Sequence, residues 1–405
     1  MPPQALDDLL VLDLTHYVAG PYCTKRLADF GARVIKIEPP LHGDPGRQLG
    51  PFPNDAPHPE TSGLFLHLNT NKESVTLNLK RLRGRQLFFK LLEHADIVVE
   101  NFRPGVMRNL QLDYPLLRRV KPSVVMTSIS NFGQTGPYRD WRAQDLTLYA
   151  MGGEMYSSGA IDRDPLKQAP GLTLFQGGSV AATATMVGVF GARRHHIGQH
   201  IDIALFETQA GSIDRRLTSL VAYQYNGASP GPEDPMPVGI MPSGVYPCRD
   251  GFVDIRVNFR WWDRLVAMMD RPELHEDPRF NTEEARFNLA NREAFLTLFQ
   301  AWLMRYTRQE VMRRAQRFRI PGTAINLPGE VIDDPHFAER GAFVDVDHPV
   351  AGRWQLPGAP FRPQLTPGQA LRSAPLLGQH TDAVLQEFTN LDATEIAALK
   401  QANII

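Results

Sequence analysis

The chain has little cysteine and no excess of charge of either sign. Its 405 residues include only two cysteines, Cys23 and Cys248, too few for a disulfide framework. With 43 basic and 44 acidic residues, the totals indicate neither a nucleic acid nor an anionic membrane as the partner. Residues 1–30 contain no basic segment followed by a long apolar run, so we expect neither a signal peptide nor a membrane helix. We therefore expect a cytoplasmic protein.

Several sequence motifs of ligand binding and catalysis are also missing. There is no Walker loop, no G-x-G-x-x-G after a strand and no cysteine cluster of the kind that holds zinc. His195, His196 and His200 have no cysteine nearby in sequence, so we interpret them as a polar turn and predict no metal. Ser179 follows two glycines, but Ala181 stands where a nucleophile elbow needs glycine.

The absence with the greatest consequence is that of acidic residues in the middle of the chain. No Asp or Glu occurs between residues 165 and 201. In this segment a glycine leads into small and β-branched residues, a build that carries a nucleophile or a base in many enzymes. Any catalytic carboxylate must therefore come from elsewhere in the chain, or from a different chain.

The residues that are present predict an α/β fold. Residues 9–14 and 34–37 read as buried strands, and residues 22–30 between them read as a helix. This rhythm repeats along the first half of the chain, which predicts a Rossmann-like parallel sheet with helices on both faces. Ligands of such sheets bind at the carboxyl ends of the strands. These ends are predicted at residues 15–20, 39–44, 101–105 and 131–136.

The sequence changes character after about residue 223. Residues 226–244 are rich in Pro and Gly and mark a boundary or a surface crossing. Beyond them we predict a hairpin around Asp250 and Gly251, then three helical runs, which together form a smaller α+β unit. A final helix is expected near the end of the chain, capped by Asp392 or Thr394.

Seven segments, in this order, resemble the class III CoA-transferases, a family related to carnitine and formyl CoA-transferases and to α-methylacyl-CoA racemases. They are LDLTHYVAGPYCTKRLADFGARVIKIEPPLHGDPGR, LNTNKESVTLNLK, ADIVVENFRPGVM, SISNFGQTGPY, GQHIDIALFE, DPHFAERGAFVDVDHPVAG and PLLGQHTDAVLQE. The resemblance implies a Rossmann-like large domain built from both chain ends, residues 1–222 and 330–405. It also implies a small domain, residues 223–329, and an interlocked dimer.

The same resemblance implies a site for coenzyme A, the expected substrate or ligand, with no tightly bound cofactor. The residues it assigns to CoA are His16, Tyr17, Ala19, Lys72, Asn101, Phe102, Val106 and Arg108. Lys72 is expected to meet a phosphate, and Asn101 and Phe102 to hold the pantetheine. A side chain that closes its own turn is the alternative for Asn101. The arginine usual in the family falls on Asn109, with Arg108 one place early.

The catalytic aspartate of the family has no counterpart in this chain. Alignment on the glycines at 177 and 178 places Leu174 at that position, and shifted registers give Phe175, Gln176 or Gly177. Racemases of this family use a histidine before an aspartate, and here that pair is Gln144 and Asp145. Because glutamine is not a general base near pH 7, racemase chemistry is disfavoured. We predict no catalytic residue at these positions.

Two hypotheses of function remain. In the first, the chain is the Asp-less subunit of a heteromeric CoA-transferase, inactive alone, and a homologous partner supplies the aspartate. It then resembles one chain of succinyl-CoA:benzylsuccinate CoA-transferase, an enzyme of anaerobic toluene breakdown. In the second, it is an independent acyl-CoA-binding protein or an enzyme that has taken up another reaction.

Overall fold

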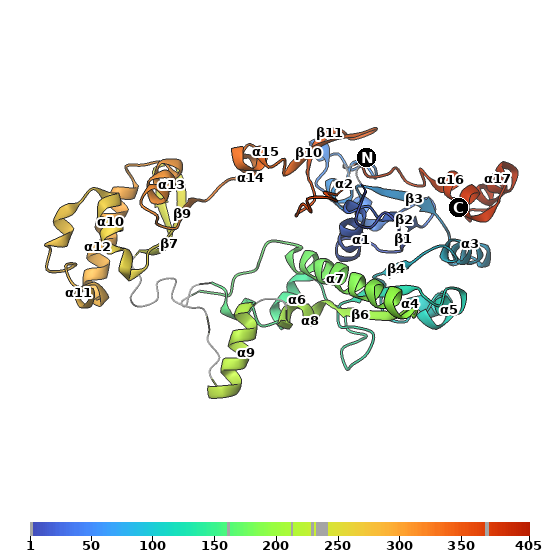
Figure 1. Ribbon diagram of the computed structural model, residues 1–405, viewed down its shortest axis with the longest axis horizontal. Helices are drawn as coiled ribbons and strands as arrows, with labels where there is room; N and C mark the ends of the chain where they lie inside the picture. Colours follow the sequence, from blue (N-terminus) through green and yellow to red (C-terminus); the bar gives the residue numbers. More distant parts are fainter. Residues whose placement is uncertain (1–2, 160–162, 212–213, 228–230, 232–241, 369–371) are drawn as a thin grey trace. The chain divides into compact units, whose positions relative to one another are not determined.

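The computed structural model describes residues 3–159, 163–211, 214–227, 231, 242–368 and 372–405. Two compact units are present (Figure 1). The larger, unit 1, consists of residues 1–155, 167–227 and 336–405, and the smaller, unit 2, of residues 156–166 and 228–335. The sequence-based division was drawn at 223–329, without residues 156–166. Most of the Pro- and Gly-rich segment 226–244 lies outside the described residues.

Unit 1 is built on a six-stranded sheet in which every pair of neighbours is parallel. The strands are β1 (Leu10–Asp13), β2 (Arg33–Glu38), β3 (Lys72–Thr76), β4 (Ile97–Glu100), β5 (Val125–Ser130) and β6 (His200–Ala204). Their order, β3-β2-β1-β4-β5-β6, is that of a Rossmann sheet. The predicted α/β class and parallel sheet are confirmed.

Two apolar layers cover the two faces of this sheet. Consecutive residues of β1 face opposite sides, so Val11 belongs to one layer and Leu12 to the other. Helices α1 (Ala19–Asp29) and α7 (Leu172–His195) supply the layer that contains Val11. The layer with Leu12 is supplied by α3 (Leu82–Leu92), α5 (Tyr114–Val120), α16 (Thr381–Thr389) and α17 (Ala393–Gln401). The C-terminal helices thus pack on a sheet formed by the N-terminal half.

Helix α7 is the longest described helix, with 24 residues. By length and composition alone it is apolar enough to cross a membrane. In the structure it packs along α1 and against β5 and β6, and small residues such as Ala181 and Gly188 are buried there. We therefore interpret α7 as a core helix of unit 1.

Unit 1 contains further helices and strands besides the six-stranded sheet and the helices named above. They are α2 (Gly63–Leu68), α4 (Val106–Asn109), α6 (Asp145–Met151), α8 (Leu205–Gly211), α9 (Asp214–Asn226), β10 (Phe343–His348) and β11 (Gly352–Pro357). Strands β10 and β11 form an antiparallel ribbon. The side chain of Asp392 accepts a hydrogen bond from the backbone N–H of Glu395, so Asp392 is the predicted cap of the last helix.

Unit 2 contains an antiparallel sheet in the order β7-β8-β9. Its elements are β7 (Ser243–Cys248), β8 (Gly251–Arg256), α10 (Trp262–Met269), α11 (Glu283–Phe287), α12 (Leu289–Leu303), α13 (Arg308–Arg317), β9 (Gly322–Ala324) and α14 (Pro328–Ile332). The short helix α15 (Pro335–Glu339) follows. The turn at Asp250 joins β7 and β8 as predicted, and Val253, Phe295 and Phe299 lie in a core of this unit's own.

Candidate functional site

The buried carboxylate of Asp13, the last residue of β1, stabilises the loop that follows this strand. One oxygen accepts a hydrogen bond from the backbone N–H of Thr15 at 2.9 Å. The other accepts from the hydroxyl of Thr24 at 2.6 Å and from Lys72 Nζ at 3.0 Å. Burial alone would raise the pKa of Asp13, but the ammonium groups of Lys72 and Lys36 hold it well below its usual range. Asp13 is therefore a charged anchor for the start of this loop.

A second buried ion pair fixes the same loop at its next residues. Lys36 Nζ donates to the carbonyl oxygen of Thr15 at 2.7 Å and lies 2.9 Å from Asp44 Oδ2. Asp44 Oδ1 in turn accepts from the backbone N–H of Tyr17 at 3.1 Å. Tyr17 has a positive φ of 66°, an uncommon conformation for a non-glycine residue, and these contacts hold it there.

The loop after β4 is tied to the loop after β1 by one amide side chain. Asn101 Oδ1 accepts from the backbone N–H of His16 at 2.7 Å, and its Nδ2 donates to the carbonyl oxygen of His16 at 2.8 Å. The His16 ring packs edge-on against Phe102, with centroids 5.3 Å apart. Asn101 therefore bridges two strand ends, and does not close its own turn.

Lys72 does not lie where a phosphate can reach it. Its Nζ donates to Asp13, Thr24, Asn69 Oδ1 and the carbonyl oxygen of Pro21, at distances between 2.8 and 3.0 Å. The side chain is fully buried. The sequence-based expectation of a phosphate contact is therefore replaced by a structural role, because these internal acceptors already occupy the ammonium group.

Gly20 lets the start of α1 pack against Thr15 of the loop after β1, and Gly178 lets α7 approach α1 closely. A Cβ atom on Gly20 would lie 2.3 Å from Thr15 Cβ, and one on Gly178 would lie 2.5 Å from the carbonyl oxygen of Ala19. The double glycine before Ser179 is thus a packing feature. Ser179 is exposed, lies within α7 and donates its hydroxyl to the carbonyl oxygen of Phe175, which agrees with the rejection of a nucleophile elbow.

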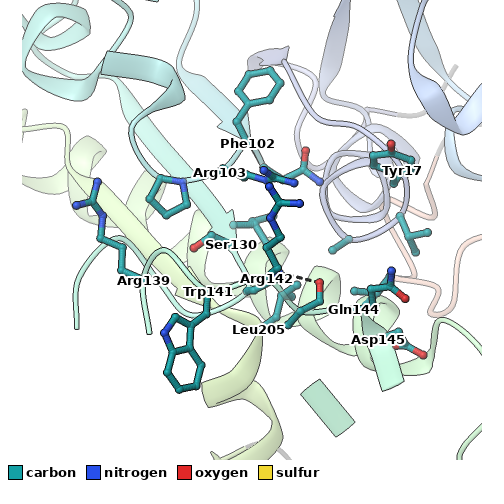
Figure 2. Close-up of a pocket in the computed structure, with 18 of the residues that line it drawn as sticks. Tyr17, Phe102, Arg103, Ser130, Arg139, Trp141, Arg142, Gln144, Asp145 and Leu205 are labelled. Atoms are coloured by element: carbon teal, nitrogen blue, oxygen red, sulfur yellow. Dashed lines mark hydrogen bonds between the residues drawn. The ribbon is translucent and has the colours of Figure 1, made fainter. Parts of the chain in front are cut away.

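A cavity of about 630 Å³ lies at the carboxyl ends of β1, β4 and β5, and we call it the strand-end cavity (Figure 2). It is lined by Tyr17, Val18, Ala19, Leu49, Asn101, Phe102, Arg103, Pro104, Ile129, Ser130, Asn131, Arg139, Trp141, Arg142, Ala143, Gln144, Asp145, Leu174 and Leu205. Figure 2 shows Tyr17 on one side and Arg139 and Trp141 on the other. Three of the four strand-end loops predicted from the sequence, at residues 15–20, 101–105 and 131–136, contribute to this cavity either directly or through adjacent residues.

The first turn of α7 reaches this cavity through Leu174. Phe175 points elsewhere, since its ring packs edge-on against Tyr22 with centroids 4.9 Å apart. Gln176 is directed toward α8, where its Nε2 donates to the carbonyl oxygen of Thr208. Of the positions considered for the missing aspartate, Leu174 is therefore the one that lines the cavity, and its side chain has no group that can act as a nucleophile.

Asp145 is the one carboxylate among the lining residues. Its Oδ2 accepts the backbone N–H of Gly171 at 2.9 Å, at the residue that precedes α7. Gln144 caps α6 together with Thr147. Asp145 Oδ1 is buried and has no hydrogen-bond partner. Asp145 thus positions the first turn of α7. The sequence had pointed to Asp145 only as the counterpart of the racemase aspartate, not as a residue that positions this helix.

Three arginines of the strand-end cavity were missed from the sequence: Arg103, Arg139 and Arg142. Arg103 and Arg142 are exposed, and among the described residues no carboxylate forms an ion pair with either. Arg139 Nε is buried without a hydrogen-bond partner and lies 4.0 Å from Asp140. All three lie in or beside predicted strand-end loops. That position in the sequence could have identified them as residues of the ligand cavity. Together they give the cavity a positive rim.

The other predicted CoA residues lie at different depths. Tyr17, Ala19, Asn101 and Phe102 line the strand-end cavity. His16 lies just behind them, and burial lowers the pKa of its imidazole, which Asp44 only partly offsets. Val106 and Arg108 belong to α4 and do not line the cavity.

A buried glutamate lies beneath the loop of Asn101 and Phe102. Glu100 Oε2 accepts the backbone N–H of Phe102 at 2.7 Å. Burial raises the pKa of Glu100 to about 7, although hydrogen bonds from Ser128 and Phe102 oppose the rise. The protonation of Glu100 therefore changes near neutral pH, directly under the cavity.

No group of three or more His, Cys, Asp or Glu side chains placed to hold a metal ion occurs in the part of the chain that the structure describes. His195 is the last residue of α7, His196 follows it in a left-handed conformation, and His200 begins β6, with its Nε2 2.8 Å from Ser128 Oγ. The histidine-rich segment is thus a turn from helix to strand.

Comparisons with known proteins show which family and which solved structures this chain is similar to. The model of CoA-transferase family III matches residues 6–381. Succinyl-CoA–D-citramalate CoA-transferase of Chloroflexus aurantiacus is 34% identical, over 100% of this chain and 99% of the relative. The alpha subunit of succinyl-CoA–L-malate CoA-transferase from the same species is 33% identical, over 99% and 92%. A CAIB/BAIF family protein from Brucella suis has a TM-score of 0.85 at 29% identity, over 95% of this chain and 99% of that one.

Proposed function

This chain belongs to CoA-transferase family III, and on that premise we propose that it is the subunit without a nucleophile in a cytoplasmic, heteromeric CoA-transferase. A homologous partner chain supplies the aspartate. The observation that carries the proposal is the side chain of Leu174, which lines the strand-end cavity where the family resemblance places the aspartate. Our chain then contributes a CoA-binding scaffold and shapes the dimer.

The reaction requires a carboxylate that becomes covalently bound. The aspartate oxygen attacks the thioester carbonyl, the C–S bond breaks, and CoA leaves as a thiolate, so that a mixed anhydride forms. The thiolate then attacks the aspartyl carbonyl and the first acid departs, which leaves CoA as an enzyme thioester. The second acid repeats these steps in reverse and leaves as a new acyl-CoA. Leucine has no lone pair with which to begin this sequence.

In the proposed CoA site, the fixed loops and the arginines have different tasks. The backbone of Tyr17 and Ala19 and the side chains of Asn101 and Phe102 form a rigid wall for the pantetheine. The guanidinium groups of Arg103, Arg139 and Arg142 bind phosphate oxygens, for which their planar donor pattern is well suited. Preformed geometry matters here because a fixed wall loses little conformational entropy when the ligand binds.

We propose succinyl-CoA as the donor. Both of the relatives named above carry succinyl-CoA in their names, and one of them is an alpha subunit. The acceptor is a carboxylic acid, and an aromatic succinate such as benzylsuccinate is the candidate implied by the resemblance to the enzyme of toluene breakdown.

One observation favours a second candidate, in which the chain acts on acyl-CoA by itself. Asp145 lines the same cavity as Leu174, and its Oδ1 is without a hydrogen-bond partner. A carboxylate there is able to replace the absent aspartate if the thioester carbonyl reaches it. We favour the first candidate because Oδ2 of Asp145 already holds the N–H of Gly171 at the start of α7.

The test is to purify the chain alone and together with a homologue that carries the aspartate, encoded by a neighbouring gene. CoA transfer from succinyl-CoA to a panel of carboxylic acids is then measured. We expect activity only in the complex, and we expect replacement of the partner's aspartate by asparagine to abolish it. Transfer catalysed by the chain alone contradicts the proposal.

A further inference from the structure

Unit 1 has a second cavity, of about 400 Å³, which shares no lining residue with the strand-end cavity. We call it the ribbon cavity, because it lies between helices α1 and α2 and the segment around strands β10 and β11. Its lining residues are Tyr22, Arg26, His67, Phe337, Arg340, Ala342, Phe343, Pro357, Gly358, Ala359, Pro360, Phe361 and Arg362. Nothing in the proposed transfer reaction uses this cavity.

The charged side chains of the ribbon cavity are all cationic. Arg340 is exposed and forms no ion pair with any carboxylate in the described part of the chain. Arg362 donates from Nη2 to the carbonyl oxygen of Gly341 at 2.6 Å, which leaves its other donors available. Arg26 contacts Asp29 at 3.2 Å, but its Nε is buried without a hydrogen-bond partner. Three guanidinium groups thus face one cavity with no acid among its lining residues.

The rest of the wall is aromatic and apolar. Phe337 and Phe343 meet edge to face with centroids 5.8 Å apart. Phe361 is 59% exposed although it stacks on Phe30, with centroids 4.2 Å apart, so one face of its ring remains open. Tyr22 completes the wall, with the guanidinium of Arg26 over its ring. Open aromatic faces beside cations suit a flat apolar group that carries an oxyanion.

His67 adds a neutral polar group to this wall. Burial, with smaller contributions from the cations Lys25 and Arg26, lowers the pKa of its imidazole to about 4. At neutral pH the ring therefore carries no charge and offers one donor and one acceptor. The positive charge of the cavity thus comes from the arginines, which stay protonated at any pH where the protein is folded.

We propose that the ribbon cavity is a binding site for an arylalkanoic acid. The guanidinium groups of Arg340 and Arg362 hold its carboxylate, and its ring lies against Phe361 and Phe343. The volume suits a small ligand of this kind, since ligand cavities typically begin at about 300 Å³. The site is separate from the strand-end cavity, so occupancy of one does not require that of the other.

The test uses isothermal titration of the full chain with 3-phenylpropanoate. Binding is expected to weaken about tenfold in Arg340→Gln and in Arg362→Gln, because each loses a charge-assisted hydrogen bond. Arg119→Gln, an exposed substitution on α5, serves as the matched control and is expected to bind like the wild type. Arg103→Gln, which alters the strand-end cavity, is also expected to leave the affinity unchanged.

Three analogues define the class of ligand. The neutral 3-phenylpropanamide tests the carboxylate, propanoate tests the ring, and inorganic phosphate tests for an oxyanion site without aryl preference. Each is expected to bind at least about tenfold more weakly than 3-phenylpropanoate. The proposal is overturned if the wild type does not bind 3-phenylpropanoate, if Arg340→Gln and Arg362→Gln bind it unchanged, if Arg103→Gln abolishes binding, or if phosphate binds equally well.

Discussion

The loop after β1 and the first turn of α7 face the same cavity, yet they are built in opposite ways. The loop rests on buried charged side chains, among them Asp13, Lys36 and Lys72, each of which has several partners. The turn of α7 presents Leu174, which has no polar group, and depends on Asp145 for its position. The cavity therefore joins a loop that buried charges hold in place to a helix turn whose cavity-facing side chain has no polar group.

This difference has an energetic meaning. Buried charges are expensive to remove one at a time, because each deletion leaves its partner unpaired in a poorly solvated place. Leu174 has no charged partner and packs against the apolar layer that contains Val11, so a shorter side chain there leaves no charge unpaired. We therefore expect mutations in the loop region to change stability and CoA affinity, and truncation of Leu174 to change the transferase activity of the complex hardly at all.

The largest effect is expected from Lys72→Met. Removal of the ammonium leaves Asp13 without its main counter-charge, and we expect the free energy of unfolding to fall by about 3–5 kcal/mol. Urea denaturation followed by circular dichroism measures this. Lys80→Met, an exposed change on the same stretch of chain, is the control. A Lys72 variant of normal stability that has lost CoA affinity would restore the phosphate role predicted from the sequence.

A pH-dependent effect is expected at Glu100. Its folded-state pKa of about 7 lies above the ordinary 4.5, so between these pH values the folded state keeps a proton that the unfolded state has lost. Raising the pH across this window therefore destabilises the folded protein, by up to roughly 3 kcal/mol at 1.36 kcal/mol per pKa unit. We expect Glu100→Gln to match the wild type near pH 5 and to exceed its stability at pH 8.

Unfolding by urea at pH 5, 6, 7 and 8 measures this difference. Exposed Glu93→Gln is the control, and its stability is expected to follow that of the wild type throughout. Parallel pH curves for the wild type and Glu100→Gln would show that this carboxyl has no shifted pKa.

An intermediate effect is expected from Asn101→Ala, which cuts the link between two strand ends. The variant loses two hydrogen bonds to the backbone of His16, and we expect a loss of about 2 kcal/mol in stability. CoA affinity is expected to fall about tenfold, since the wall of the cavity is no longer fixed. Calorimetry with CoA measures the affinity, with Asn109→Ala, an exposed change on α4, as the control. Stability and CoA affinity equal to those of the wild type would show that Asn101 does not hold the two strand-end loops together.

The smallest effect is expected from Leu174→Ala in the assembled complex. Because this side chain takes no part in bond formation, transferase activity is expected to stay within about twofold of the wild type. This corresponds to a change in the activation free energy of well under about 1 kcal/mol. Steady-state assays with succinyl-CoA as the donor measure it, and Gln176→Ala, which faces α8, is a second control. A loss of several orders of magnitude would mean that this half-site reacts.

The sequence predicted the strands and the α/β class because buried parallel strands are short apolar runs separated by amphipathic helices. It also located the strand ends at which Tyr17, Asn101 and Leu174 meet. It did not predict the role of Lys72, because the sequence of a strand end does not reveal whether a lysine there points to solvent or into a charged core. Arg103, Arg139 and Arg142 were overlooked because a family resemblance directs attention to matching residues, whereas cavity charge depends on where loops converge.

The most direct test of the central claim is intact-mass spectrometry of the purified chain after incubation with succinyl-CoA. The claim predicts that the wild type gains no covalent CoA or succinyl adduct, whereas Leu174→Asp, which places a carboxylate on the same cavity wall, gains one. Leu174→Asn is the matched control and is expected to remain unmodified. A wild-type adduct that maps to Asp145 would contradict the account and make this chain a transferase with a nucleophile of its own.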